Sequence, residues 1–145
     1  MQNGELVVFG KRSHLFYTGP VNGANFRNFE LSLEIKTFPK ANSGVYIHTA
    51  YQETGWPDKG YEVQVNNSQG DPVRTGSLYN VVKKFTAPAE DDTWFTLEVM
   101  VVGKAVTVRV DGRVLYEFVE PEGVTGTRKL SAGTFALQAH DPGSE

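Results

Sequence analysis

The chain has 145 residues, of which 39% are hydrophobic, and this length fits one domain that buries a sizeable core. Its formal net charge of -3 gives no basic stripe of the kind that nucleic-acid binding requires, so we expect no nucleic-acid partner. The chain has 0 Cys, which excludes thiol nucleophiles, disulfide bonds and thiolate metal sites, and no apolar run is long enough to span a membrane.

Short strands are predicted along the whole chain, because apolar and polar residues alternate with a period of two in many segments. The clearest run is 29–35, where Phe, Leu, Leu and Ile alternate with Glu, Ser and Glu. The pair Asp111-Gly112 predicts a type I′ hairpin turn between two of the later strands. In chain order, the predicted strands cover residues 5–9, 14–18, 29–35, 44–50, 61–66, 76–81, 95–101, 106–110, 113–118 and 134–139.

About ten short strands and no helical stripe of useful length predict an all-β fold, a two-sheet antiparallel β-sandwich or jelly roll. We expect residues 1–145 to form a single β-sandwich domain. Because the chain starts inside a strand pattern and stops at a turn, we also expect a fragment trimmed at both ends that lacks the first and last strands. Long polar connections at 51–59, 67–74 and 85–93 are the loops where binding residues are expected.

Four of the predicted strands share a polar face with an unusual composition. An ordinary solvated face explains the alternation alone equally well. However, a plain solvated face mixes Lys, Glu and Thr, whereas this face collects amides, carboxylates and aromatic rings that hold sugar hydroxyls or stack on a pyranose ring. The residues on it are Tyr46, His48, Glu62, Gln64, Asn66, Ser77, Tyr79, Gln138 and His140. The aromatic side chains available for stacking are Tyr46, Tyr51, Trp56, Tyr61 and Tyr79.

A metal site is a second interpretation of the same face. His48 and His140 together with Glu62 offer ligands for a divalent ion, although the three His residues of the chain show no tight metal-binding spacing. His14 lies among apolar residues and is interpreted as an ordinary packed side chain. Lys83 is interpreted as half of a solvated lysine pair, with substrate contact as the alternative.

Two segments carry a family resemblance: residues 42–48 read Asn-Ser-Gly-Val-Tyr-Ile-His, and residues 60–65 read Gly-Tyr-Glu-Val-Gln-Val. Together they resemble the 3-keto-disaccharide hydrolase domain family, whose members are also called 3-keto-glucoside lyases or hydrolases. Further family-like segments are 26–31, 75–79, Trp94, Asp111-Gly112 and 137–140, so the resemblance extends from about residue 3 to the end. It implies a concanavalin A-like jelly roll and a periplasmic or extracellular location.

The resemblance also implies cleavage of a glycoside whose C3 hydroxyl has been oxidised to a ketone. The ketone acidifies the C2 hydrogen, so a base removes it, an enolate forms and the C1 substituent leaves. This chemistry does not need the two carboxylates of ordinary glycosidases, and we expect no second carboxylate beside Glu62. A non-catalytic carbohydrate-binding module of the same fold is the alternative, and a structural appendage with a wet polar face is the third possibility.

Roles for individual residues follow from this implied reaction. We expect His48 or His140 to transfer the proton, with Glu62 orienting that group or binding a metal ion together with His48. Lys83 is expected to stabilise the enolate oxygen. The residues expected to hold the sugar are Tyr46, Trp56, Gln64, Tyr79 and Gln138.

Overall fold

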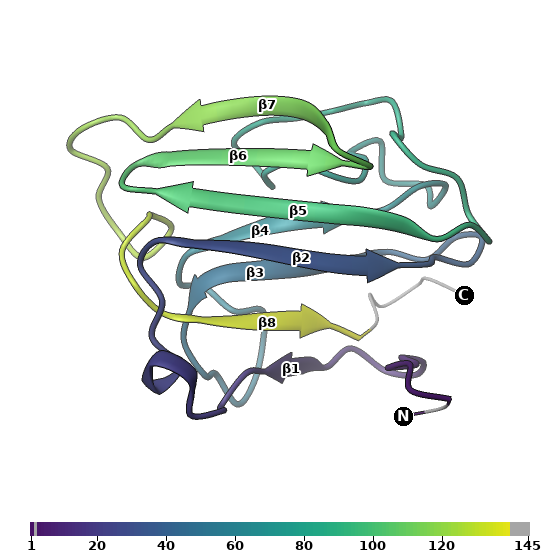
Figure 1. Ribbon diagram of the computed structural model, residues 1–145, viewed down its shortest axis with the longest axis horizontal. Helices are drawn as coiled ribbons and strands as arrows, with labels where there is room; N and C mark the ends of the chain where they lie inside the picture. Colours follow the sequence, from purple (N-terminus) through teal and green to yellow (C-terminus); the bar gives the residue numbers. More distant parts are fainter. Residues whose placement is uncertain (2, 140–145) are drawn as a thin grey trace.

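The computed structural model describes residues 1 and 3–139, which form two four-stranded antiparallel sheets in two layers (Figure 1). The β3 sheet has the strand order β1-β8-β3-β4, and the β6 sheet has the order β2-β5-β6-β7. The predicted all-β, two-sheet antiparallel sandwich of the jelly-roll type is therefore confirmed. The strands of the β3 sheet are β1 (His14–Phe16), β8 (Thr134–Gln138), β3 (Ser43–Thr49) and β4 (Tyr61–Val65). The strands of the β6 sheet are β2 (Phe29–Ile35), β5 (Phe95–Val102), β6 (Ala105–Val110) and β7 (Arg113–Val119).

The β6 sheet contains the meander that the sequence predicts. Strands β5 and β6 are joined at Gly103, whose φ is +59°, and strands β6 and β7 are joined at Asp111 and Gly112. Positive φ values at both residues of the second connection, +49° and +73°, are those of a type I′ turn. The turn matches the right-handed twist of the flanking strands, so the Asp-Gly pair positions β7 beside β6.

The hydrophobic core lies between the two sheets. Apolar residues of β3 and β4 contact those of β5 and β6, and most of their side chains are completely buried. Burying one Val, Leu or Ile side chain stabilises a fold by about 1.5–3 kcal/mol, so this layer holds the sheets together. The central members are Val45, Ile47, Val63, Leu97, Val99, Val101, Val106 and Val108.

Two predicted strands are absent from the described part of the chain. Residues 6–9 form no strand, and their apolar side chains are exposed, with Phe9 at 93%. Residues 76–81 make only isolated bridges at Leu78, which pairs with Val63 and Val82. For residues 6–9 the apolar run does not specify a pairing partner, and this is why that prediction is wrong. Residues 77–79 do lie beside β4, with backbone hydrogen bonds between Ser77 and Gln64 and between Tyr79 and Glu62. The positive φ values of Gly76 and Asn80 turn the chain on either side, so this segment is too short to form the predicted strand.

Helical structure is minor, as predicted. The short 3-10 segment η1 (Val21–Ala24) contains positive φ values at Asn22 and Gly23, so it is closer to a turn than to a regular helix. Within residues 1 and 3–139, no helix has the length and apolar character needed to cross a bilayer. The predicted loops 51–59, 67–74 and 85–93 contain no strand.

Candidate functional site

A pocket of about 320 Å³ opens on the face of the β3 sheet that points away from the core, and it is called the Glu62 pocket here. Its floor comes from β3, β4 and β8, and its rim comes from the connecting loops. The volume is at the small end of the usual range for ligand pockets, which suits one or two sugar rings. The lining residues are Asn42, Tyr46, Trp56, Glu62, Gln64, Asp71, Tyr79, Arg128 and Gln138.

Small residues lie beside the large polar side chains on this face of the β3 sheet. In the strand register Tyr46 lies between Glu62 on β4 and Ala136 on β8, so a large ring is flanked by a small side chain. Gly44 lies beside Gln64, and a Cβ atom at Gly44 would collide with the carboxylate of Glu62. The glycine of the Asn-Ser-Gly segment therefore lies within strand β3 and leaves space for the Glu62 side chain.

Amide side chains form one wall of the pocket. Gln64 donates from Nε2 to Oδ1 of Asn42 at 2.5 Å, and Asn42 donates from Nδ2 to Oε1 of Gln69 at 3.4 Å. Ser43 donates from Oγ to the backbone oxygen of Gln138 at 2.6 Å, which ties β3 to β8 at this wall. Buried amides with fixed partners hold their remaining donors and acceptors in set directions, as recognition of hydroxyl groups requires.

Tyr46 and Glu62 form a buried polar pair at the floor of the pocket. Tyr46 is fully buried, and its hydroxyl lies 3.4 Å from Oε1 of Gln138 and hydrogen-bonds to Glu62. Burial, followed by the negative charge of Glu62, raises the pKa of Tyr46 far above its usual value. The phenol therefore stays protonated at neutral pH and acts as a hydrogen-bond donor at the floor of the pocket.

The rim supplies one cation, one further carboxylate and two aromatic rings. Arg128 is the cation among the lining residues that the structure describes, and it lies close enough to oppose the rise in the Tyr46 pKa. Asp71 is a second carboxylate, and its Oδ1 accepts the backbone N–H of Val73 at 2.8 Å. The expectation that Glu62 has no carboxylate neighbour on this face is therefore wrong, because a loop residue supplies one.

The whole sequence, residues 1–145, matches the family described as the 3-keto-alpha-glucoside-1,2-lyase-like domain. The chain belongs to this family. The family resemblance read from the sequence is thus confirmed, whereas no curated protein sequence matches the chain.

Solved structures show the same fold at low sequence identity. A candidate glycosyl hydrolase from Parabacteroides distasonis superposes with a TM-score of 0.70 at 18% identity, covering 92% of this chain and 78% of that protein. A second candidate glycosyl hydrolase from that organism has a TM-score of 0.66 at 21% identity, with coverages of 80% and 67%. The carbohydrate-binding module CBM66 of Bacillus subtilis has a TM-score of 0.62 at 11% identity, with coverages of 94% and 77%. At these identities the likeness shows a shared β-sandwich architecture.

Most of the predicted sugar-holding residues of this lyase-like domain come together in one place. Tyr46, Trp56, Gln64, Tyr79 and Gln138 all line the pocket that contains Glu62. The polar side chains of β3, β4 and β8 therefore converge on one pocket, as predicted. The roles of these side chains toward a ligand stay predictions. His140 lies outside the described residues.

His48 does not join this pocket. The register between β3 and β8 shifts between Tyr46 and Thr49, and His48 has a φ of +53°, so a β-bulge ends the alternation. Gly60 and Gly133 lie against the backbone of the bulge, where a Cβ atom on either would collide. The prediction that His48 shares the polar face is wrong because one extra residue turns its side chain away.

Both ring nitrogens of His48 form hydrogen bonds with backbone groups. Nδ1 accepts the N–H of Ser131 at 3.1 Å, so Nε2 carries the hydrogen and donates to the backbone oxygen of Arg27 at 2.9 Å. The ring also packs edge-on against Phe29 of the opposite sheet, with 5.5 Å between ring centroids. Burial lowers the pKa of His48, which keeps it neutral. These contacts describe a structural histidine.

The metal ligands expected from sequence are separated by the same bulge. Both ring nitrogens of His48 have backbone partners, and Glu62 lies in the pocket without His48. Across residues 1 and 3–139, no group of three or more His, Cys, Asp or Glu side chains is placed to hold a metal ion. The described donor set therefore does not fit a His48–Glu62 metal site.

Three further residues lie away from the pocket lining. Lys83 is exposed and is not a lining residue. Tyr51 is 71% exposed and contacts Phe16 edge-on. Tyr61 belongs to the core, where its hydroxyl donates to Oε2 of Glu120 at 2.7 Å, so it cannot stack on a ligand in the pocket.

His14 is the residue whose interpretation changes most. Its ring lies edge-on to Tyr46 at 5.3 Å and to Trp56 at 5.6 Å, so it supports the aromatic side of the pocket. Its Nε2 is buried without a hydrogen-bond partner among the described atoms, and burial lowers its pKa. Arg12 covers the Trp56 ring, with Cζ 4.7 Å from the ring centroid. The sequence gives one signal for this supporting role of His14, which is a polar ring within an otherwise apolar strand.

Proposed function

We propose that the Glu62 pocket binds a glycoside oxidised at C3 and cleaves it by elimination. The observation that carries this proposal is the buried Glu62 carboxylate, which lies beside a protonated phenol at the floor of a sugar-sized pocket. Membership of the 3-keto-alpha-glucoside-1,2-lyase-like family supports the same substrate class. Glu62 takes the role of base because His48 lies elsewhere and is held by backbone groups.

The proposed reaction has three steps. Glu62 removes the hydrogen at C2, and the electrons of the C2–H bond form an enolate on the C3 oxygen. As the enolate returns to a ketone, the C1–O bond breaks and the departing oxygen takes the proton from Glu62, which leaves a C1–C2 double bond. Water then adds across that bond to complete net hydrolysis.

Stabilisation of the enolate is the demanding part of this reaction. The protonated Tyr46 hydroxyl, which is hydrogen-bonded to Glu62, and the Arg128 guanidinium of the pocket lining take this role in place of Lys83. The amides of Gln64 and Gln138 hold sugar hydroxyls, and Trp56 or Tyr79 packs on a ring face. Tyr46 and Gln64 are buried and already hydrogen-bonded within the protein, so little reorganisation of these two groups is needed when charge develops.

The decisive experiment measures cleavage of 3-keto-trehalose or a 3-keto-glucoside and follows exchange of the C2 hydrogen with solvent deuterium. Glu62→Gln is expected to lower kcat by roughly 10² to 10⁴, the usual contribution of a general base. Glu34→Gln, at an exposed site on β2, is the matched control and should leave kcat unchanged. His140→Ala tests the second predicted proton-transfer group. Wild-type turnover by Glu62→Gln would reject the pocket as the site of reaction.

A non-catalytic carbohydrate-binding module is the second candidate function. The shared architecture with a carbohydrate-binding module of Bacillus subtilis supports it, because the same pocket can hold a sugar without reacting. This function predicts saturable binding of a disaccharide with no product and no C2 exchange. Cleavage of the unoxidised glycoside at a similar rate would instead favour hydrolysis by the carboxylates of Glu62 and Asp71.

The location proposed for the protein is the periplasm or the cell exterior. Membership of a family of carbohydrate-active domains supports this placement, and cell fractionation of the native host tests it. Recovery of the protein only with the cytoplasm would contradict the placement without touching the proposed reaction.

A further inference from the structure

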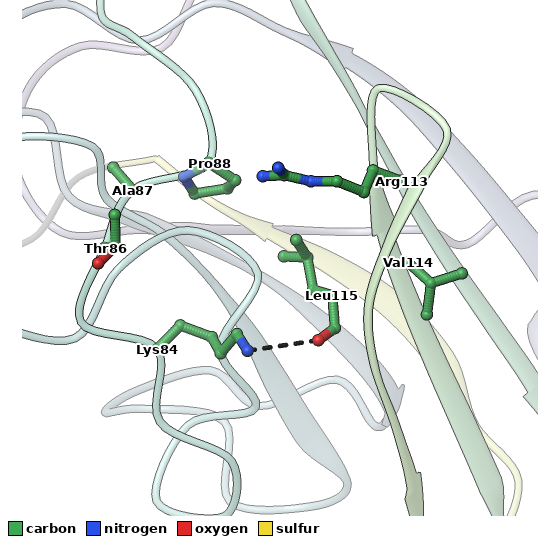
Figure 2. A pocket seen from close by; sticks show the side chains of 7 residues that line it. All are labelled: Lys84, Thr86, Ala87, Pro88, Arg113, Val114 and Leu115. Carbon is green, nitrogen blue, oxygen red and sulfur yellow. Dashed lines mark hydrogen bonds between the residues drawn. The ribbon is translucent and has the colours of Figure 1, made fainter.

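A second hollow of about 270 Å³ lies at the opposite layer of the sandwich and shares no lining residue with the Glu62 pocket. It is called the Lys84 hollow here. The start of β7 forms one side and the loop that follows residue 83 forms the other (Figure 2). The lining residues are Lys84, Thr86, Ala87, Pro88, Arg113, Val114 and Leu115.

Lys84 is held in place from several directions. Its backbone N–H donates to Oγ of Ser77 at 2.9 Å, and its backbone oxygen accepts the N–H of Arg74 at 2.8 Å. Its ammonium group donates to the backbone oxygen of Leu115 on β7 at 3.3 Å, as the dashed line in Figure 2 marks. One N–H of the ammonium is thus directed to the protein, and two are left for a ligand.

Arg113 brings a second positive charge into the same hollow. Figure 2 shows its side chain reaching from β7 toward Pro88, above Lys84 and Leu115. In the described part of the chain the ion pairs are Lys104–Glu122 and Arg109–Glu30, so neither cation of the hollow is neutralised by a carboxylate. The seven described lining residues include no Asp or Glu.

Two unneutralised cations beside apolar walls select a particular ligand chemistry. A guanidinium binds a carboxylate through two parallel hydrogen bonds, and an ammonium adds a third donor. Ala87, Pro88 and Leu115 offer carbon surface for the body of the ligand, which a bare inorganic anion would not use. The volume suits a single ring.

We propose that the Lys84 hollow binds the carboxylate of an acidic sugar, with the uronate group on Arg113 and Lys84 and the C–H face of the ring on the apolar wall. The inference stands apart from the proposed function, because the two sites share no lining residue. A saccharide is the first ring to test because of the family to which the chain belongs.

The experiment is a titration of the labelled protein followed by amide resonances, with methyl β-glucuronide as the probe. Glucuronide is expected to shift resonances of residues 84–88 and 113–115, and methyl β-glucoside, which lacks the carboxylate, should not shift them. Sulfate is expected to bind about tenfold more weakly, since it uses the cations but not the apolar wall. Equal binding of sulfate would identify a site for bare anions and overturn the proposal, as would equal binding of the glucoside.

Variants connect the response to the two cations. Arg113→Met and Lys84→Met are each expected to weaken glucuronide binding about tenfold or more. Arg109→Met, on the neighbouring strand and outside the hollow, is the control that should bind as the wild type does. Arg113→Lys keeps the positive charge but cannot form two parallel hydrogen bonds with a carboxylate, so intermediate affinity for glucuronide is expected. This variant tests the site even if Arg113→Met folds poorly. Glucuronide shifts confined to residues 62, 64 and 138 would place binding in the other pocket and reject this site.

Discussion

The two sheets of the sandwich share one alternating pattern, yet their polar faces differ. On the β6 sheet, the outward residues of the edge strand β2 are exposed, and the Glu30 side chain is 59% exposed in its contact with Arg109. On the β3 sheet, the equivalent positions Tyr46, Glu62 and Gln64 are 0%, 7% and 3% exposed. Loops that fold over the β3 sheet bury its polar face. Polar groups that are buried and hydrogen-bonded to specific partners therefore indicate a functional site more reliably than polar composition alone.

The largest effect on the buried polar face of the β3 sheet is expected from Gly44→Ala. The new methyl group would occupy the space of the Glu62 carboxylate, so we expect the unfolding free energy to fall by about 1–3 kcal/mol and sugar cleavage to fall about 100-fold. Urea denaturation and the 3-keto-glucoside assay measure the two effects. Ser32→Ala, an exposed position on β2, is the matched control and should change neither. Full activity in Gly44→Ala would show that Glu62 does not need this space.

The sequence predicts the fold well because alternation depends on local chemistry. Residues 29–35 and 95–102 have apolar side chains at every second position, and the structure makes both of them strands. Residues 6–9 have a similar local pattern, but forming a strand also requires a neighbouring strand, which the pattern does not specify. Residues 76–81 have such a neighbour in β4, but turns at Gly76 and Asn80 interrupt the segment. The convergence of Glu62, Gln64 and Gln138 was predictable for the same reason, since no bulge interrupts β4 or β8 before them.

The errors at the site arise from contacts between distant segments. His48 follows the alternation in sequence, but the bulge beside Gly60 and Gly133 turns it away from the pocket. His14 has apolar neighbours in sequence, whereas its ring contacts Tyr46 and Trp56, which come from later parts of the chain. Neither the bulge nor the loop that carries Trp56 leaves a periodic signal, so only coordinates reveal them.

Acid should affect the β3 sheet through its two described histidines, both of which carry pKa values lowered by burial. In the unfolded chain these groups return to a pKa of about 6.5, so below that pH the unfolded state binds protons that the folded state excludes. Stability is therefore fully present above about pH 7 and is lost as the pH falls toward the lowered values. We expect a loss of about 1–2 kcal/mol between pH 7 and pH 5.5, at a limiting slope of about 1.4 kcal/mol per pH unit for each His.

Urea unfolding across this pH range measures the loss, and His14→Phe separates the two groups. The Phe ring keeps the edge contacts to Tyr46 and Trp56 but cannot titrate, so the slope should fall toward that of one histidine. An unchanged slope in His14→Phe would assign the acid sensitivity to other groups.

The smallest effect is expected at the exposed pair formed by Lys104, in the turn between β5 and β6, and Glu122, which follows β7. Their Nζ and Oε2 atoms are 2.6 Å apart, but the two side chains are 43% and 90% exposed, so water screens the attraction. Lys104→Met should lower the unfolding free energy by less than about 0.5 kcal/mol. Tyr46→Phe, which removes one hydroxyl from the buried floor of the other sheet, should cost about 1–3 kcal/mol because Gln138 and Glu62 each lose a buried hydrogen bond. Equal losses of unfolding free energy in the two variants would mean that burial does not distinguish the two polar faces. A clearly smaller loss in Lys104→Met would show that the Lys104–Glu122 ion pair, although short, is the weaker interaction because it is exposed to solvent.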